Sequence, residues 1–245
     1  MAQTAAGVAR DMQLEIWSDV VCPWCAIGKR RFEAALARFA HRDEVTVRWR
    51  SFELDPSAPA ERTVDNVEHL AAKYGMSRGE AEAAQARVAD AAAAEGWTFD
   101  LGRSRGGNTV DAHRLLHLAA EHGVQDAVKE RFFAGYFEQG ERIGDPATLV
   151  RLAADAGLDA DEARAVLAGD RYRDDVRADE EQARAYGITG VPFFVVDRRY
   201  GVSGAQPADV LLEVLDKAWA DAHPQPVLTP AGGRGEVCDD GSCAV

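Results

Sequence analysis

Short runs of alternating apolar and polar residues in the first fifty positions predict two strands. One run covers 13–18 and the other 45–50, and in each the apolar side chains recur at every second position. Between them, Phe32 and Leu36 begin a helical spacing of apolar residues and predict an amphipathic helix that ends near residue 40. This part of the chain is therefore expected to form a β-α-β unit.

The middle of the chain has a different pattern. Between 60 and 186 the strand signals almost vanish and Ala-rich segments with helical spacing follow one another, so we expect a helical insertion. Strand-like runs return at 193–196 and 200–202 as a predicted hairpin, and a last helix is expected after Pro207. The expected divisions are 12–59 for the first half of an α/β domain, 60–186 for the insertion, 187–222 for the second half, and 223–245 for a flexible tail rich in Pro and Gly.

The charge balance excludes several classes of partner. The 245 residues carry 28 basic and 41 acidic side chains, a formal net charge of -13, without a Lys- or Arg-rich run. Nucleic acids and anionic membrane surfaces both require clustered positive charge, so neither is an expected partner. No stretch approaches the ~20 apolar residues of a membrane-spanning helix, and the segment 1–13 lacks the apolar core of a secretory signal, which predicts a cytoplasmic protein.

Two of the four cysteines, Cys22 and Cys25, form a C-x-x-C pair at the expected strand-to-helix turn. Within a β-α-β unit this spacing is typical of redox chemistry. Pro23 fits the first helical turn, where its missing N–H costs no hydrogen bond. Because the positive end of the helix dipole favours a thiolate at Cys22, we predict that Cys22 is the nucleophile and that Cys25 resolves the mixed disulfide.

The other two cysteines, Cys238 and Cys243, have C-x4-C spacing in the tail. All four cysteines together could bind a structural zinc ion, but the second spacing and its acidic, Pro- and Gly-rich surroundings make this the weaker interpretation, and no metal site is expected. The two aspartates of the tail motif are expected to raise the pKa of its thiols and to favour a reducing couple. Two hypotheses follow: an auxiliary pair that exchanges with Cys22 and Cys25, or an exposed pair that oxidises adventitiously.

Two further residues are candidates for supporting roles at the site. Asp19 precedes Cys22 by three residues, on the strand side of the turn. Its carboxylate either accepts the proton of Cys25 during resolution or only binds amide groups of the turn. His113, in the insertion, is the weaker candidate, since a histidine on a helix face is more often structural.

The chain resembles a known family over about 14–219. The run 18–28, with Cys-Pro-Trp-Cys at its centre, resembles the active-site turn of the DsbA family, specifically of its FrnE-like branch. Further matches lie at 108–116, 190–194 and 203–207. The resemblance implies an α/β, thioredoxin-like fold with a large all-helical insertion. It also implies a thiol-disulfide oxidoreductase or isomerase that acts on protein disulfides.

The resemblance also assigns residues around the pair. A thioredoxin-like fold carries a cis-proline opposite the C-x-x-C pair, and this position is Pro192 here, although the sequence is compatible with either isomer. Val191, Pro192 and Trp24 are then expected to bind substrate, with the Val191 backbone beside an extended peptide. Periplasmic DsbA has a histidine in place of Trp24. Because an indole stabilises the Cys22 thiolate less, a less strongly oxidising couple is expected.

The expected enzyme uses its redox-active disulfide and no other cofactor, with glutathione as a candidate exchange partner. Its expected partners are protein thiols and disulfides and a protein that recycles the pair. Two alternatives differ in class. Glutathione-dependent 2-hydroxychromene-2-carboxylate isomerases and kappa-class transferases share the architecture but have Ser at the position of Cys22, so the Cys22–Cys25 pair disfavours them. A chaperone that binds peptides without turnover is the second alternative.

Overall fold

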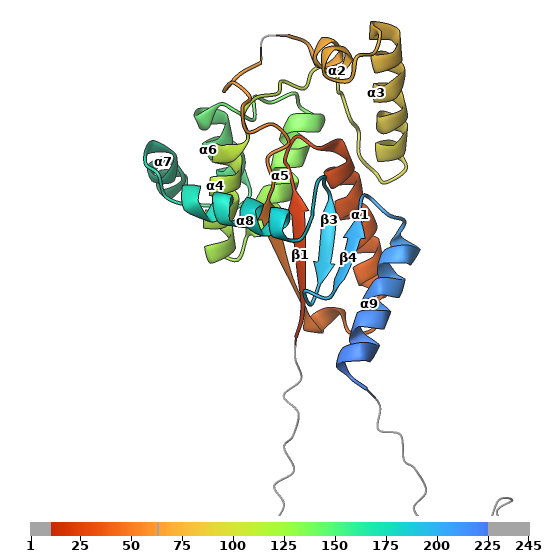
Figure 1. The fold of residues 1–245 in the computed structure, drawn as a ribbon. Coiled ribbons are helices and arrows are strands. Elements are labelled where there is room, and N and C mark those ends of the chain that lie inside the picture. The colour runs from red at the N-terminus through yellow and green to blue at the C-terminus, as the bar shows by residue number, and fades with distance from the viewer. Residues whose placement is uncertain (1–10, 63, 225–245) are drawn as a thin grey trace, which may run out of the picture.

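The computed structural model describes residues 11–62 and 64–224, which form a mixed sheet with helices packed on both faces (Figure 1). In chain order the elements are β1 (Met12–Ser18), α1 (Pro23–Arg38), the 3-10 helix η1 (Arg42–Glu44), β2 (Val45–Ser51), α2 (Asn66–Tyr74), α3 (Arg78–Ala93), α4 (Val110–Glu121), α5 (Gln125–Phe137), α6 (Pro146–Asp155), α7 (Ala160–Ala168), α8 (Arg173–Ala185), β3 (Phe193–Val196), β4 (Tyr200–Ser203) and α9 (Ala208–Ala222). The predicted β-α-β unit, hairpin and last helix are confirmed. The residue bounds of the expected domains stay predictions.

The sheet has the strand order β2-β1-β3-β4. β1 pairs with β2 in parallel and with β3 in antiparallel orientation, and β3 and β4 form the hairpin. Ile16 at the centre of β1 lies opposite Trp49 of β2 and Phe194 of β3. Since side chains alternate along a strand, this register places one apolar layer on each face.

The two faces of the sheet are covered by different helices. Leu14 and Ile16 point to the face that α1 and α9 cover, where Phe32 and Leu211 complete the core. Trp17 points to the other face and packs against Val195, Ile188 and the end of α8. The strands are thus buried from both sides, which fixes the position of the turn that follows β1.

Helices α4 to α7 form a second core with the active-site turn. This core includes Leu115, Phe133 and Leu152 of the insertion together with Cys22 and Cys25. The insertion is therefore packed onto the cysteines and is not a separate body beside them. No helix in the part of the chain that the structure describes is long and apolar enough to cross a membrane.

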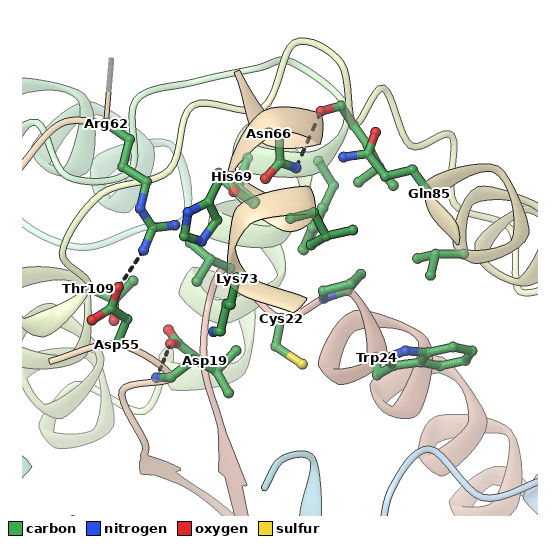
Figure 2. Close-up of a pocket in the computed structure, with 18 of the residues that line it drawn as sticks. Asp19, Cys22, Trp24, Asp55, Arg62, Asn66, His69, Lys73, Gln85 and Thr109 are labelled. Atoms are coloured by element: carbon green, nitrogen blue, oxygen red, sulfur yellow. Dashed lines mark hydrogen bonds and ion pairs between the residues drawn. The ribbon is translucent and has the colours of Figure 1, made fainter. Parts of the chain in front are cut away.

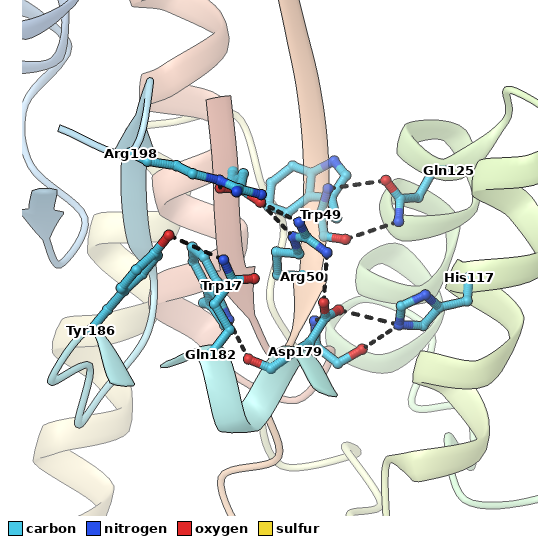
Figure 3. Close-up of polar contacts among 11 residues, drawn as sticks. Trp17, Trp49, Arg50, His117, Gln125, Asp179, Gln182, Tyr186 and Arg198 are labelled. Carbon is cyan, nitrogen blue, oxygen red and sulfur yellow. Dashed lines mark hydrogen bonds and ion pairs between the residues drawn. The ribbon is translucent and has the colours of Figure 1, made fainter. Parts of the chain in front are cut away.

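A polar network joins α8 and α5 to the edge strand β2 (Figure 3). Arg50 of β2 donates to Asp179 Oδ1 at 2.8 Å and also to Glu15 of β1. The side-chain amide of Gln125 binds the backbone of Trp49 like a neighbouring strand, with 3.0 Å from the Trp49 N–H and 2.9 Å to its carbonyl. These bonds cover polar groups that an edge strand otherwise leaves unpaired.

Helices α2 and α3 lie above the N-terminal end of α1 and are held mainly by local signals (Figure 1). Asp65 caps α2 by accepting from the Glu68 N–H, and Ser77 and Glu80 form a capping box on α3. α2 has no buried residue, and α3 buries only two alanines. Tertiary packing therefore contributes less to this helix pair than to the rest of the insertion.

Candidate active site

The two cysteines lie at the start of α1. Cys22 is the N-cap, Pro23 is the first helical residue, and the Cys25 N–H donates to the Cys22 carbonyl at 3.0 Å. Both are free thiols, and the Cys25 side chain is fully enclosed whereas Cys22 keeps 4% exposure. The first turn carries no acidic side chain, so the helix dipole acts on the cysteines without a competing charge from that turn.

The proline loop contacts Cys22 directly. The Val191–Pro192 peptide bond is cis, the isomer that the resemblance implies. Cys22 Sγ donates to the Val191 carbonyl at 3.6 Å. Gly28 of α1 permits this approach, because a methyl group at that position would come 3.0 Å from Pro192 Cγ. Cys22, Val191 and Pro192 are thus brought together from opposite ends of the chain.

The two thiols ionise as a coupled pair. The hydrogen bond with Cys25 and then burial raise the pKa of Cys22. Burial opposes ionisation of Cys25, but hydrogen bonds from Cys22 and Ser18 and the positive charge of Lys129 outweigh it and lower its pKa. The first proton therefore leaves the pair more easily than the second, and the resulting negative charge is favoured on Cys25, whereas the helix dipole alone predicted it on Cys22.

Lys129, which sequence reasoning missed, lies behind the pair. It comes from α5, is fully buried, and donates to the Ser18 carbonyl at 3.4 Å. Within residues 11–62 and 64–224 it forms no ion pair. Burial lowers its pKa to about 8, against the opposing charges of Cys25 and Asp19. A lysine between the apolar residues Val128 and Phe132 of one helix was the signal in the sequence.

Asp19 and His113 meet in the same buried region. Asp19 Oδ2 accepts from the Leu54 N–H at 2.8 Å, and its Oδ1 lies 3.3 Å from His113 Nε2. Burial raises the pKa of Asp19, but His113 and the Leu54 amide outweigh it and lower the pKa. A carboxyl with a lowered pKa stays ionised and is a weak base. The role of Asp19 as proton acceptor for Cys25 stays a prediction.

A pocket of about 370 Å³ opens beside Cys22, a volume in the range of small-ligand sites (Figure 2). One wall is the active-site turn with Trp24, which is 43% exposed. The opposite wall comes from the start of the insertion, which the sequence did not connect with the site. Its polar and apolar lining includes Arg62, Asn66, His69, Lys73, Gln85 and Val88.

Cys238 and Cys243 lie outside the described residues, so exchange between them and the Cys22–Cys25 pair stays a prediction. Among residues 11–62 and 64–224, no group of three or more His, Cys, Asp or Glu side chains is arranged to hold a metal ion. The site in this part of the chain therefore consists of two thiols, a buried Asp–His pair, a buried lysine and the pocket.

Comparisons with known proteins match this fold. A family model described as "DSBA-like thioredoxin domain" matches residues 13–216. The crystal structure of a probable DsbA oxidoreductase from Streptomyces coelicolor is similar with a TM-score of 0.83 and 48% identity, over 96% of this chain and 99% of that chain. The uncharacterized protein YwbO of Bacillus subtilis (strain 168) is 28% identical over 206 residues, 83% of this chain and 96% of that protein. The cytosolic disulfide reductase DsbM of Pseudomonas aeruginosa, solved with GSH, shares only the fold, with a TM-score of 0.57 and 18% identity over 84% of this chain and 98% of that chain. The expected thioredoxin-like fold with a helical insertion is confirmed.

Proposed function

Because the chain belongs to the DSBA-like thioredoxin domain family, we propose that it is a thiol-disulfide oxidoreductase that works through Cys22 and Cys25. One observation carries the assignment of roles. Cys22 caps α1 with its sulfur on the pocket wall, whereas Cys25 is fully enclosed behind it. A substrate sulfur in the pocket can therefore reach Cys22 and not Cys25. Cys22 is the nucleophile, and Cys25 resolves the mixed disulfide from the inner side.

The surroundings supply what this exchange needs. Lys129 favours a single negative charge in the pair by lowering the pKa of Cys25, and transfer of the Cys22 proton to Cys25 then gives the Cys22 thiolate at the helix N-terminus, which attacks. The Val191 backbone, in contact with Cys22 Sγ, offers polar groups to an extended substrate. The Asp19 carboxylate, 3.3 Å from His113 Nε2, holds a fixed negative charge under the turn.

The finer parts of the proposal concern branch and partners. We assign the chain to the FrnE-like branch on the Cys-Pro-Trp-Cys turn, with protein thiols and disulfides as substrates, a recycling protein as partner and glutathione as an exchange partner. The 48% identical Streptomyces coelicolor protein is described as a probable DsbA oxidoreductase, which supports the oxidoreductase assignment. The cytoplasmic location stays a prediction.

The roles of the two cysteines are tested by trapping. The variant Cys25→Ser should accumulate a mixed disulfide on Cys22 when it is mixed with a disulfide-bonded peptide, because the resolving thiol is absent. The same peptide after reduction and alkylation is the negative control. The variant Cys22→Ser should accumulate none at Cys25. Mass spectrometry of the active-site peptide reads the adduct apart from Cys238 and Cys243. Adducts on Cys25 of the Cys22→Ser variant at the same rate would contradict the assigned roles.

A further inference from the structure

The pocket beside Cys22 contains positive charge, although the chain as a whole carries a net charge of -13. Arg62, His69 and Lys73 lie together on one side of Cys22, with Trp24 on the other side (Figure 2). A basic side chain that has no carboxylate partner attracts anions to its own place on an otherwise acidic protein. Whether each of these side chains can bind an anion depends on its partners within the protein.

Two of the three basic side chains are neutralised or uncharged within the protein. Arg62 forms an ion pair of 2.7 Å with Asp55. Burial and then the positive charges of Arg62 and Lys73 lower the pKa of His69, so its ring is neutral at pH 7. Lys73, exposed on α2, forms no ion pair in the described part of the chain. The remaining carboxylate on the wall, Asp19, is held by Leu54 and His113.

The pocket also holds an unused hydrogen-bond donor. Gln85 Nε2 on α3 is buried and has no hydrogen-bond partner within the described residues. The neighbouring amide of Asn66 is already used, since it donates to the Leu101 carbonyl at 3.4 Å. A buried amide donor without an acceptor costs free energy that a ligand oxygen can recover. Lys73 supplies a charge and Gln85 a neutral donor on the two helices that roof the pocket.

We propose that this pocket is a carboxylate-binding subsite, in which Lys73 binds a carboxylate that lies close to the reacting disulfide of the substrate, while Gln85, on the opposite side of the pocket, donates to another oxygen of a larger substrate (Figure 2). The inference rests on the proposed function and names its substrate class: disulfides with an acidic group near the sulfur. The same chemistry occurs in a small dicarboxylate disulfide and in a peptide with Asp or Glu beside its cysteine. Val88 and Trp24 line the remaining space with apolar surface for the carbon chain between sulfur and carboxylate.

The subsite serves a balanced exchange. The Cys22 thiolate attacks one sulfur of R–S–S–R, forms Cys22–S–R and releases RS⁻, which takes up a proton. Cys25 then attacks Cys22 Sγ, closes the intramolecular disulfide and releases the second RSH. The protein pair loses two electrons and two protons, and the substrate disulfide gains both. The carboxylate remains bound to Lys73 through the first step, so it positions the sulfur without reacting.

The test compares three small disulfides that differ in charge: the anionic 3,3'-dithiodipropionate, the neutral bis(2-hydroxyethyl) disulfide and the cationic cystamine. The reduced full chain is mixed with each, quenched with acid and alkylated, and mass spectrometry follows the peptide that contains Cys22 and Cys25. Each rate is divided by the rate at which dithiothreitol reduces the same disulfide, which removes differences in leaving-group reactivity. At low ionic strength we expect the anionic disulfide to be preferred over the neutral one by about three-fold or more and the cationic one to be slowest, with the preference shrinking in ~0.5 M salt.

The variant Lys73→Met should lower the ratio of anionic to neutral rates by about three-fold, and Lys73→Glu should invert the preference toward cystamine. Gln85→Leu should leave the ratio unchanged, because Gln85 is uncharged and lies on the opposite side of the pocket from Lys73. Lys217→Met is the matched control, because it removes the same charge from the exposed surface of α9. Circular dichroism checks that each variant is folded before its ratio is interpreted, because an unfolded chain also reacts with disulfides and would lower the ratio by itself.

Three outcomes separate the claims. An equal fall in Lys73→Met and Lys217→Met means general attraction by net charge and overturns the subsite, as does an unchanged ratio in Lys73→Met. A chain that reacts with no disulfide refutes the proposed function itself. Peptide disulfides with Asp or Asn beside the cysteine then identify the source of the carboxylate. Faster reaction with the Asp peptide than with the Asn peptide would identify peptides as the substrates. Equal rates with the two peptides, together with a retained preference for dithiodipropionate, would identify small disulfides.

Discussion

Lys129 is a buried charge that the fold tolerates beside the redox pair. Among the described residues it has one hydrogen bond, to a backbone carbonyl, and its ammonium lies near the rings of Trp49 and Phe133. The lowering of its pKa from 10.5 to about 8 corresponds to a cost on the order of 3 kcal/mol when it is charged. A residue that destabilises the fold and stabilises a thiolate is explained by function and not by packing.

The variant Lys129→Met is expected to be more stable and less reactive. At pH 7 both folded and unfolded lysine are protonated, so the full cost is present and the free energy of unfolding should rise by roughly 2–3 kcal/mol in the variant. Loss of the positive charge should move the ionisation of Cys25 to higher pH. Urea unfolding measures the first effect, and the pH profile of thiolate ultraviolet absorbance, with Cys238 and Cys243 replaced by serine, measures the second.

The pH dependence of Lys129→Met distinguishes charge from shape. As pH rises through about 8, native Lys129 loses its proton while the unfolded lysine keeps it up to 10.5, so the wild type gains stability across this window. The stability gap between the two proteins should therefore close toward pH 10.5. Lys217→Met, at an exposed site on α9, should change neither profile. A thiolate-absorbance profile of Lys129→Met identical to that of the wild type would show that the lysine does not act on the thiols.

Asp179 connects helix α8 to strand β2 through hydrogen bonds of its side chain (Figure 3). Its carboxylate accepts from Arg50 at 2.8 Å and from the Ser51 N–H at 2.9 Å, and lies 3.2 Å from His117. Its carbonyl accepts from the Trp17 indole at 2.9 Å. One residue of α8 thus contacts the edge strand β2, its neighbour β1 and helix α4. Removing one member of such a buried network leaves the remaining charged and polar groups buried without a hydrogen-bond or ion-pair partner.

The variant Asp179→Asn should lower the free energy of unfolding by about 3 kcal/mol at pH 7, because the new amide places a donor against Arg50 or Ser51. Burial raises the pKa of Asp179, but His117, Ser51 and Arg50 outweigh it and lower the pKa. Its stabilisation is therefore present above the unfolded pKa near 3.9 and is lost as pH falls through the lower folded value. The difference between variant and wild type should shrink in urea unfolding at pH 3.

The matched control for this variant is Asp161→Asn on α7. Asp161 also pairs with an arginine, but its side chain is 92% exposed. The substitution should change the free energy of unfolding by less than about 0.5 kcal/mol. Equal losses in the two variants would show that the buried network has no special contribution.

The elements were predictable from the sequence because their signals are local. Alternation marked β1 and β2, and Pro207 marked the start of α9, of which it is the N-cap residue. The C-x-x-C spacing identified Cys22 and Cys25 for the same reason. The burial of Lys129 and the approach of Lys73 to the site were not predictable, since both depend on how insertion helices pack against a turn more than 40 residues away.

The helical insertion has two parts that differ in how much of their surface is buried, and we expect them to differ in stability. Helix α4 buries eight residues and shares its core with the cysteines, whereas α2 buries none. Helices α2 and α3 mainly pack against each other and against α1. The part of the insertion that supports the cysteines is thus firmly packed, and the part that roofs the pocket is weakly packed. Local opening should begin at the roof.

Hydrogen exchange should therefore show a gradient across the insertion. The backbone amides of α2 are expected to exchange orders of magnitude faster than those of α4, because opening α2 exposes little apolar surface and opening α4 exposes the shared core. Mass spectrometry of peptides from 66–74 and 110–121 measures both.

In the Cys25→Ser variant, a 3-mercaptopropionate adduct on Cys22 should slow exchange in α2, since Lys73 gains a partner, whereas a 2-mercaptoethanol adduct should slow it less. Equal rates in α2 and α4 would contradict the unequal stability of the two parts, and equal effects of the two adducts would place the carboxylate away from the roof.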